Sequence, residues 1–362
     1  MANPQVIPLD DNLRFQREGC AALGSTVYAR ILDGILADLV AGGVCAAVLG
    51  PHAGDSVNTA LPLRFLGSVH RQVLDGRAPA LAAHYASVGG TPGPTLVEDF
   101  LAAVADLRPE IEDRIGLGVQ TNEVGRSAAL VGGYAEVTRR SGLPLRVLEV
   151  GASAGLNLRW DGFWYDTGAS TFGDPASGVR FEGWWDGAPP DLSSGATVAA
   201  RAGCDRNPLD ITTDDGRTTL RSYVWPDQVE RLARLDAALA VADRVPATVE
   251  PADLGTWLED RLAEPVPGAA TVVVHSIVWQ YVSRESRDRM RAALRAAGER
   301  AAPDHPVAWL RMEPAGAVAD LRLTWWPGGS EDVLGTAGYH GRPVQWGAPV
   351  SPPPGPASAP AR

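Results

Sequence analysis

The stretch LRVLEVGASAGLNL, residues 145–158, constrains the fold of this chain most. An apolar run ends at Glu149, a turn of small residues follows from Gly151 to Gly155, and Leu156 begins what reads as a helix. A strand, a glycine turn and a helix in this order let a backbone approach a nucleotide-like ligand closely. The spacing E-x-G-x-x-x-G is neither the dinucleotide nor the phosphate-loop pattern, and no lysine follows Gly155. The turn therefore predicts a ligand with hydroxyls and a positive charge rather than phosphates.

The hydrophobic pattern predicts a helical N-terminal region over residues 1–140. Apolar residues recur there at spacings of four, which is typical of a helix face that packs on a neighbour. The clearest example is the series Val27, Ile31, Ile35 and Leu39.

From residue 145 onward the pattern changes to strands that alternate with helices. The buried run at 270–279, ATVVVHSIVW, suits a parallel strand that is covered on both faces. We therefore predict an α/β domain over residues 141–347, with a Rossmann-like, mostly parallel, doubly wound sheet. An insertion of short strands and loops is expected at about 159–225. Two alternating stretches, 321–326 and 339–346, predict a hairpin that ends the sheet.

Composition excludes several classes of partner. The 362 residues suffice for two domains, and the formal net charge of −11 disfavours nucleic acid and anionic membranes. Three cysteines lie far apart without metal-ligand spacing, so we expect no metal and a reduced, cytoplasmic environment. No signal peptide and no apolar run of about 18 residues is found. The Pro-, Ala- and Ser-rich tail, 348–362, is expected to be disordered.

The order of these segments resembles the class I S-adenosylmethionine-dependent methyltransferase fold. VLEVGASAGLN is similar to the first motif of that superfamily, and ATVVVHSIVWQYVSRESRDRMRAALRAAG is similar to its fourth strand, loop and helix. The segment 321–346 is similar to its last two strands. The whole chain, including QTNEVGRSAALVGGY, is also similar to an uncharacterised bacterial family, a domain of unknown function. The first resemblance implies S-adenosylmethionine as cofactor and a small molecule as methyl acceptor; the sequence indicates no oligomeric state.

The resemblance also implies a set of cofactor-binding residues. The glycine turn is expected at the amino-acid end of the cofactor, and an acid after strand two at the ribose. No suitable acid follows within ~20 residues of the turn, so Asp205 is the first candidate and Asp166 the second. Asp253 matches the acid that faces the adenine amine. The complete set is Glu149, Gly151, Ala152, Ser153, Gly155, Asn157, Asp205, Asp253, Ser276 and Arg126.

Several of these residues have a second interpretation. Arg126, at a helix start, could reach the carboxylate of the cofactor or form a surface ion pair of little energetic weight. The glycine turn could serve tight strand–helix packing without any ligand.

The loop after the predicted strand 270–279 supplies the catalytic candidates, His275 and Tyr281. It lacks the D/N-P-P-Y signature of enzymes that methylate base or amide nitrogens, which argues against a nucleic-acid amine as acceptor. His275 lies at the strand end where open α/β sheets bind ligands and could act as a general base, or it could be a histidine satisfied by the backbone. Tyr281 and Trp279 could form an electron-rich wall for the sulfonium, or they could simply pack.

Two alternatives remain open. Residues 151–155 match G-x-S-x-G, so Ser153 could be the nucleophile of a serine hydrolase, with Asp253 and either His275 or His340 as partners. The sheet lacks strands ahead of that turn, and no oxyanion-hole glycine motif precedes it. The chain could also be a methyltransferase-like scaffold that has lost catalysis and acts as a binding protein, because no ribose acid lies near the turn.

Overall fold

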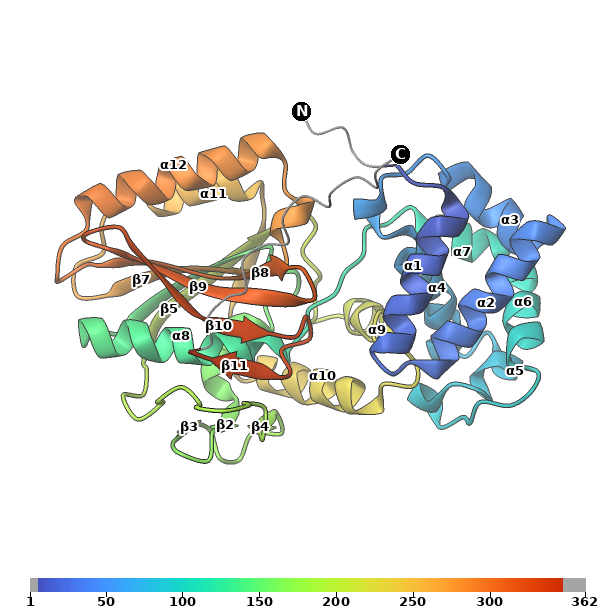
Figure 1. The fold of residues 1–362 in the computed structure, drawn as a ribbon, viewed down its shortest axis with the longest axis horizontal. Helices are drawn as coiled ribbons and strands as arrows, with labels where there is room; N and C mark the ends of the chain where they lie inside the picture. The colour runs from blue at the N-terminus through green and yellow to red at the C-terminus, as the bar shows by residue number, and fades with distance from the viewer. Residues whose placement is uncertain (1–5, 348–362) are drawn as a thin grey trace, which may run out of the picture. The chain divides into compact units, whose positions relative to one another are not determined.

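The computed structural model describes residues 6–347 and divides the chain into two compact units (Figure 1). The first comprises Met1–Thr121 and Asp210–Ala233, and the second Asn122–Leu209 and Arg234–Arg362. The expected insertion at about 159–225 is thus divided between the units. The tail for which disorder is expected, 348–362, lies outside the described residues.

The described residues of the first unit form helices joined by short turns. Their bounds are α1 Leu9–Ala22, α2 Thr26–Ala41, α3 Val44–Leu49, α4 Leu61–Leu74, α5 Pro79–Ala82, α6 Leu96–Asp106, α7 Arg108–Ile115 and α9 Asp214–Ser222, with 3-10 turns η1 Gly50–His52, η2 Val57–Thr59 and η3 Ala86–Val88. Helices occupy residues 9–115 of the region predicted to be helical, whereas α9 lies in the stretch for which short strands and loops were expected. The predicted apolar face of α2 is buried, since Val27, Ile31 and Ile35 are at most 1% exposed.

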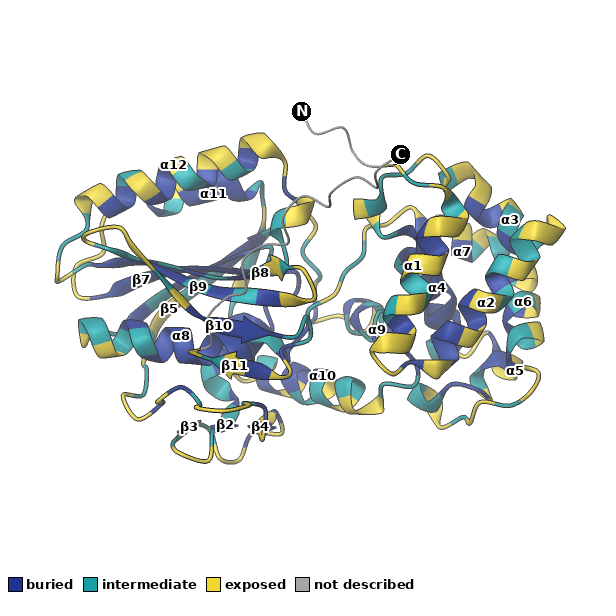
Figure 2. Ribbon diagram, viewed as in Figure 1, coloured by how far each residue is buried: buried dark blue, intermediate teal, exposed yellow. Residues whose placement is uncertain are grey.

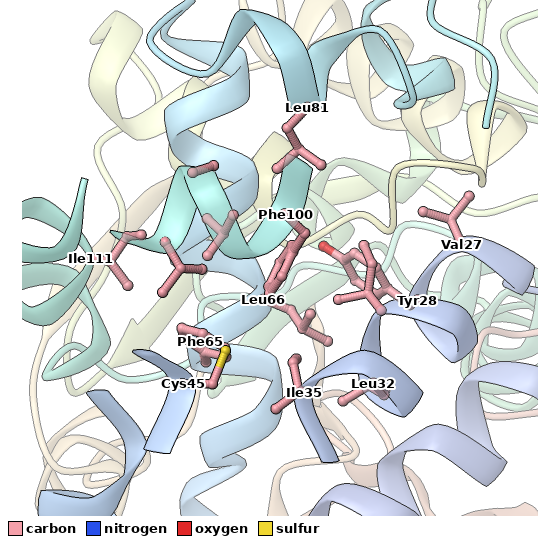
Figure 3. Packing of buried hydrophobic residues seen from close by; sticks show 14 of the residues in the cluster. Val27, Tyr28, Leu32, Ile35, Cys45, Phe65, Leu66, Leu81, Phe100 and Ile111 are labelled. Atoms are coloured by element: carbon pink, nitrogen blue, oxygen red, sulfur yellow. The ribbon is translucent and has the colours of Figure 1, made fainter. Parts of the chain in front are cut away.

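An apolar core holds the described residues of the first unit together (Figure 3). Phe65 of α4 and Phe100 of α6 pack edge to face at its centre, with ring centroids 5.9 Å apart. Residues 210–233 return to this unit, because the ring of Trp225 packs 6.2 Å from that of Tyr28. Among residues 6–347 no single helix has the length and apolarity of a membrane span, although the bent pair Thr26–Ala41 and Val44–His52 meets that test jointly.

The second unit is built on an eight-stranded mixed sheet with the order β11-β10-β9-β8-β7-β1-β5-β6. Strands β6, β5, β1, β7 and β8 are mutually parallel, and β8, β9, β10 and β11 are antiparallel. The strands are β1 Leu145–Val150, β5 Val198–Asp205, β6 Thr248–Pro251, β7 Ala270–Ser276, β8 Val307–Ala315, β9 Val318–Trp326, β10 Ser330–Ala337 and β11 Val344–Trp346. A separate small sheet contains β2 Trp164–Asp166, β3 Thr171–Gly173 and β4 Arg180–Glu182. A large, mostly parallel sheet is therefore confirmed, with antiparallel strands at its C-terminal side.

Helices cover both faces of the parallel strands (Figure 1). Those assigned wholly to this unit are α8 Arg126–Ser141, α11 Leu254–Arg261 and α12 Arg284–Arg300, while α10 Val229–Ala242 crosses the division between the units. Figure 2 shows α12 buried toward the sheet and exposed on its outer side. Met290 and Leu294 of α12 belong to the same buried apolar cluster as Val273 and Leu148 of the sheet. Helix α8 lies on the opposite face, where a Cβ at Gly133 would meet Leu310 at 2.4 Å. All residues of β7 are buried, as the apolar run predicts.

The predicted terminal hairpin is wrong in its pairing. The stretch 321–326 lies in β9, which pairs with β8 and β10, and only Val344–Trp346 of the second stretch forms a strand, β11. Strand β10 escaped prediction because it begins with polar residues and is interrupted at Gly335, which has φ +150° and lies where the β9–β10 register shifts.

The predicted α-helix after the glycine turn is also wrong. Residues Asn157–Gly162 form the 3-10 turn η4 instead, and Arg159 has non-helical backbone angles. The guanidinium Nη1 of Arg159 donates to the carbonyl of Gly155 at 2.7 Å. In an α-helix the carbonyl of Gly155 would accept the backbone N–H of Arg159. Here that N–H donates instead to the carbonyl of Leu156, as in a 3-10 turn.

Candidate functional site

The turn after β1 adopts a conformation that requires its glycines. Gly151 has φ +69° and Gly155 has φ +68°, in the left-handed region that other residues rarely adopt. A Cβ at Gly151 would lie 2.3 Å from Cγ2 of Val278, and one at Gly155 would lie 2.7 Å from Cγ2 of Val249. The turn therefore packs closely against the loop after β7 on one side and against β6 on the other.

Gly151→Ala should destabilise the second unit by about 2–4 kcal/mol, because left-handed strain adds to overlap with Val278. Gly142→Ala is the matched control: its φ is +66°, and a Cβ there would meet nothing within 4 Å. We expect Gly142→Ala to lower the free energy of unfolding by about 1 kcal/mol, from backbone strain alone. Urea unfolding of both variants tests this, and equal losses would contradict the close packing of the turn.

Two residues other than glycine are strained at the same edge of the sheet. Ser153 has φ +52° and Ile277 has φ +53°; among the described non-glycine residues, only Ala60 shares this feature. This conformation costs on the order of 1–3 kcal/mol at each residue, and it is a clear outlier for Ile277, whose side chain is β-branched. Ser153 follows β1 and Ile277 follows the neighbouring parallel strand β7, so both strained positions lie at the carboxyl ends of adjacent strands.

Glu149 is a buried carboxyl group beneath this turn. It is 4% exposed, and its Oε2 has no hydrogen-bond partner. Its pKa is raised to about 8, and burial is the main cause. The charge of Arg126 opposes this rise, the charge of Asp205 adds to it, and that of Arg159 opposes it. At neutral pH the group is therefore mostly a neutral acid, whose second oxygen is unsatisfied beside a glycine turn.

Asp205, the predicted ribose acid, is brought next to the turn by the sheet. It ends β5, which pairs with β1 on the side away from β7. Its Oδ2 accepts the backbone N–H of Ser153 and its Oδ1 that of Asn207, both at 2.9 Å. The carboxylate therefore holds the turn in place and, being partly exposed, keeps further acceptor capacity.

Asp253, the predicted adenine acid, caps helix α11. Its Oδ1 accepts the N–H of Gly255 at 2.9 Å, and its Oδ2 accepts the hydroxyl of Ser286 at 2.5 Å. Burial acts to raise its pKa, but these hydrogen bonds outweigh burial and hold the pKa below its usual range. A capping role of this kind accounts for the acid without a ligand.

His275, the predicted general base, is enclosed at the end of β7. The residue is 1% exposed, and its ring stacks on Trp279 with centroids 5.1 Å apart. Its Nε2 accepts the indole N–H of Trp309 at 3.0 Å, so the proton is on Nδ1, which donates to Glu313 at 2.6 Å. Both nitrogens are thus occupied by protein partners, but these are side chains and not the backbone carbonyl that the alternative interpretation expected.

Glu313 on β8 holds the loop after β7 in place, and the sequence analysis did not identify it. Besides His275, its carboxylate accepts the backbone N–H groups of Val278 at 3.1 Å and Trp279 at 3.2 Å. It therefore fixes the loop that touches the turn at Gly151. No local pattern marks this residue, because its partners lie 34 to 38 residues away in the chain.

Arg126 and Asn157 tie the start of α8 to the same edge. The guanidinium of Arg126 donates to the carbonyls of Ser276 at 3.0 Å and Tyr339 at 3.1 Å, and its charge acts on Glu149. Asn157 accepts the hydroxyl of Ser127 at 2.8 Å. Arg126 is thus a scaffold residue with its charge close to the turn, rather than a simple surface cap.

The remaining predicted residues divide between buried and exposed positions. Ala152 and Ser276 are buried in the turn and at the end of β7, respectively. Tyr281 lies in η5 (Trp279–Tyr281) and is 54% exposed. Its ring does not share the enclosed environment of His275.

Other features lie away from this edge. An open depression of about 690 Å³ includes Trp164, Phe172 and Val198, at the amino-terminal end of β5. Within residues 6–347, no group of three His, Cys, Asp or Glu side chains is arranged to hold a metal ion.

The second unit is an open α/β sheet in which the chain changes direction at β1. Strand β1 lies between β5, which follows it, and β7, which comes later in the chain, so the connections reverse direction at β1. Open α/β sheets bind ligands outside the carboxyl ends of the strands at such a switch point. The glycine turn, Glu149 and the strained residues all lie at this position.

Residues 10–346 match the family described as "Uncharacterized protein conserved in bacteria (DUF2332)", and the chain belongs to this family. The match confirms the resemblance of the whole chain to an uncharacterised bacterial family. No curated protein and no solved structure matches the chain.

Proposed function

We propose that this protein binds S-adenosylmethionine at the carboxyl edge of β5, β1 and β7 and transfers its methyl group to a small molecule. The observation that carries the proposal is Glu149, a buried acid with an unpartnered oxygen beneath a left-handed glycine turn at the switch point. A cationic ligand at the turn would favour ionisation of this acid.

The residues at this edge suit the cofactor in charge and in shape. The turn at Gly151 and Gly155 offers backbone without side chains, Glu149 offers a carboxyl group, and Asp205 offers further acceptor capacity for hydroxyls. When bound, S-adenosylmethionine would supply an activated methyl group on sulfur, and the chain would supply alignment and exclusion of water. The absence of an α-helix after β1 means that backbone and side chains, not a helix dipole, would hold the ligand.

The serine hydrolase alternative is weakened by the histidine geometry. His275 hydrogen-bonds to Glu313 and Trp309, which leaves His340 as the histidine that this alternative would need beside Ser153. The left-handed φ of Ser153 is the one feature that resembles a strained nucleophile turn. Labelling of Ser153 by a fluorophosphonate probe would favour that alternative over the proposal. An inactive scaffold would bind the cofactor but transfer no methyl group.

Ultraviolet photolabelling tests the proposed site. Purified protein irradiated with methyl-labelled S-adenosylmethionine should incorporate label in peptides that contain residues 149–157 or 275–281, and excess S-adenosylhomocysteine should abolish it. Gly151→Arg should lose the label, because the added side chain overlaps Val278. Gly142→Arg, at an open left-handed position, should retain it. Label confined to other peptides would contradict the proposed site.

A further inference from the structure

An arginine beside the loop after β7 has donors that the fold does not use. The guanidinium carbon of Arg287, on α12, lies 5.9 Å from the ring centroid of Trp279. Its Nε is buried and has no hydrogen-bond partner. Within residues 6–347, no carboxylate lies within ion-pair distance of this guanidinium. Buried donors are nearly always satisfied, so this one indicates a missing partner.

A second arginine adds positive charge at the same ring. The guanidinium carbon of Arg291 lies 5.0 Å from the Trp279 centroid. Its ion pair with Asp288 spans 3.2 Å, but both side chains are more than 40% exposed, so the pair contributes little. Trp279 is itself held by its stacking on His275 and by its N–H bond to Glu313. Two cationic groups thus converge on a fixed indole that follows β7.

The histidine and the glutamate that hold this loop are both engaged by protein partners. His275 uses one nitrogen as donor to Glu313 and the other as acceptor from Trp309. Glu313 is engaged by that histidine and by two backbone amides. Neither His275 nor Glu313 is therefore free to take a proton from an acceptor during methyl transfer. An acceptor that is already anionic needs no base.

We propose that the methyl acceptor is a small-molecule carboxylate, held by Arg287 with Arg291 beside Trp279. The inference rests on the proposed methyl-transfer function. A carboxylate oxygen provides the electron pair for the new O–CH3 bond, and the carbon–sulfur bond breaks with its electrons passing to sulfur. The sulfonium becomes a neutral thioether, the acceptor becomes a methyl ester, and no proton is released. Planar carboxylates are the partners that a guanidinium binds with two parallel hydrogen bonds.

Binding of benzoate and its neutral analogue benzamide tests this inference in the full-length protein with S-adenosylhomocysteine present. Ligand-observed NMR titration should show benzoate binding at least tenfold more tightly than benzamide. Arg287→Met keeps an apolar stem over Trp279 but removes the charge, and it should weaken benzoate binding at least tenfold. Arg295→Met is the matched control, because Arg295 is exposed on the same helix, and its benzoate affinity should equal that of the unmodified protein. Equal affinities for benzoate and benzamide, or an unchanged benzoate affinity in Arg287→Met, would overturn the inference.

A second measurement separates this inference from the proposed function. If S-adenosylhomocysteine binds but benzoate binding does not depend on Arg287, only the carboxylate acceptor is wrong. If benzoate binding depends on Arg287 but S-adenosylhomocysteine does not bind, an anion site exists and the methyl-transfer function is wrong. Carboxyl methylation also has its own signature, since alkali should release the transferred label as volatile methanol.

Discussion

Glu149→Gln is expected to remove a large pH dependence from the stability of this protein. The pKa of Glu149 is about 8 in the folded chain, because burial disfavours its charged form, against an ordinary value of 4.5. Between these two values the folded chain holds a proton that the unfolded chain has released. The free energy of unfolding therefore falls as pH rises through this window, by about 1.4 kcal/mol per pH unit or roughly 5 kcal/mol in total.

Glu149 stabilises the folded chain at low pH and loses this contribution as pH rises. Below pH 4.5 the carboxyl group is protonated in both states, and its contribution to stability is fully present; it is lost as pH rises toward 8. Urea unfolding at pH 5 and pH 8 should show Glu149→Gln gaining several kcal/mol over the unmodified protein at the higher pH. Glu285→Gln, at a side chain that is 81% exposed, should leave the pH profile unchanged. Parallel profiles for Glu149→Gln and the unmodified protein would show that this acid ionises normally.

Glu313→Ala is expected to destabilise the loop after β7 more than any surface change. It removes the acceptor of three donors, namely Nδ1–H of the fully buried His275 side chain and the backbone N–H groups of Val278 and Trp279. Each buried donor left unsatisfied costs about 1–3 kcal/mol. We expect a loss of about 3–5 kcal/mol in urea unfolding, and faster amide hydrogen exchange at Val278 and Trp279.

The control for this change is a glutamate that pairs at the surface. Glu182 on β4 bonds to Arg180, and the two side chains are 52% and 45% exposed, so Glu182→Ala should cost under about 1 kcal/mol. Glu313→Gln retains an acceptor oxygen and should lose less than the alanine variant. Wild-type stability and exchange rates in Glu313→Ala would mean that the loop does not depend on this carboxylate.

Local patterns in the sequence predicted the elements that position the site. Alternation and apolar runs identified β1 and β7, and Asp205 was correctly placed at the end of a strand. The glycines of the turn were predicted to allow close approach, and their φ values and packing explain why. These features depend on neighbouring residues, so periodicity and turn chemistry reveal them.

The features that sequence reasoning missed depend on distant partners. Glu313 meets His275 only because β8 lies beside β7 in the sheet, and no local pattern encodes that pairing. The buried guanidinium of Arg159, which replaces a helical N–H bond at Gly155, could not be foreseen from helix propensity. The left-handed conformation of Ile277 is likewise imposed by its surroundings, since its own side chain opposes it.

Calorimetric titration of the purified protein with S-adenosylmethionine and S-adenosylhomocysteine tests the central claim most directly. The account predicts micromolar binding of both ligands, with loss of binding in Gly151→Arg and retention in Gly142→Arg. Absence of binding by either ligand to folded protein would contradict a cofactor site at the carboxyl edge of β1.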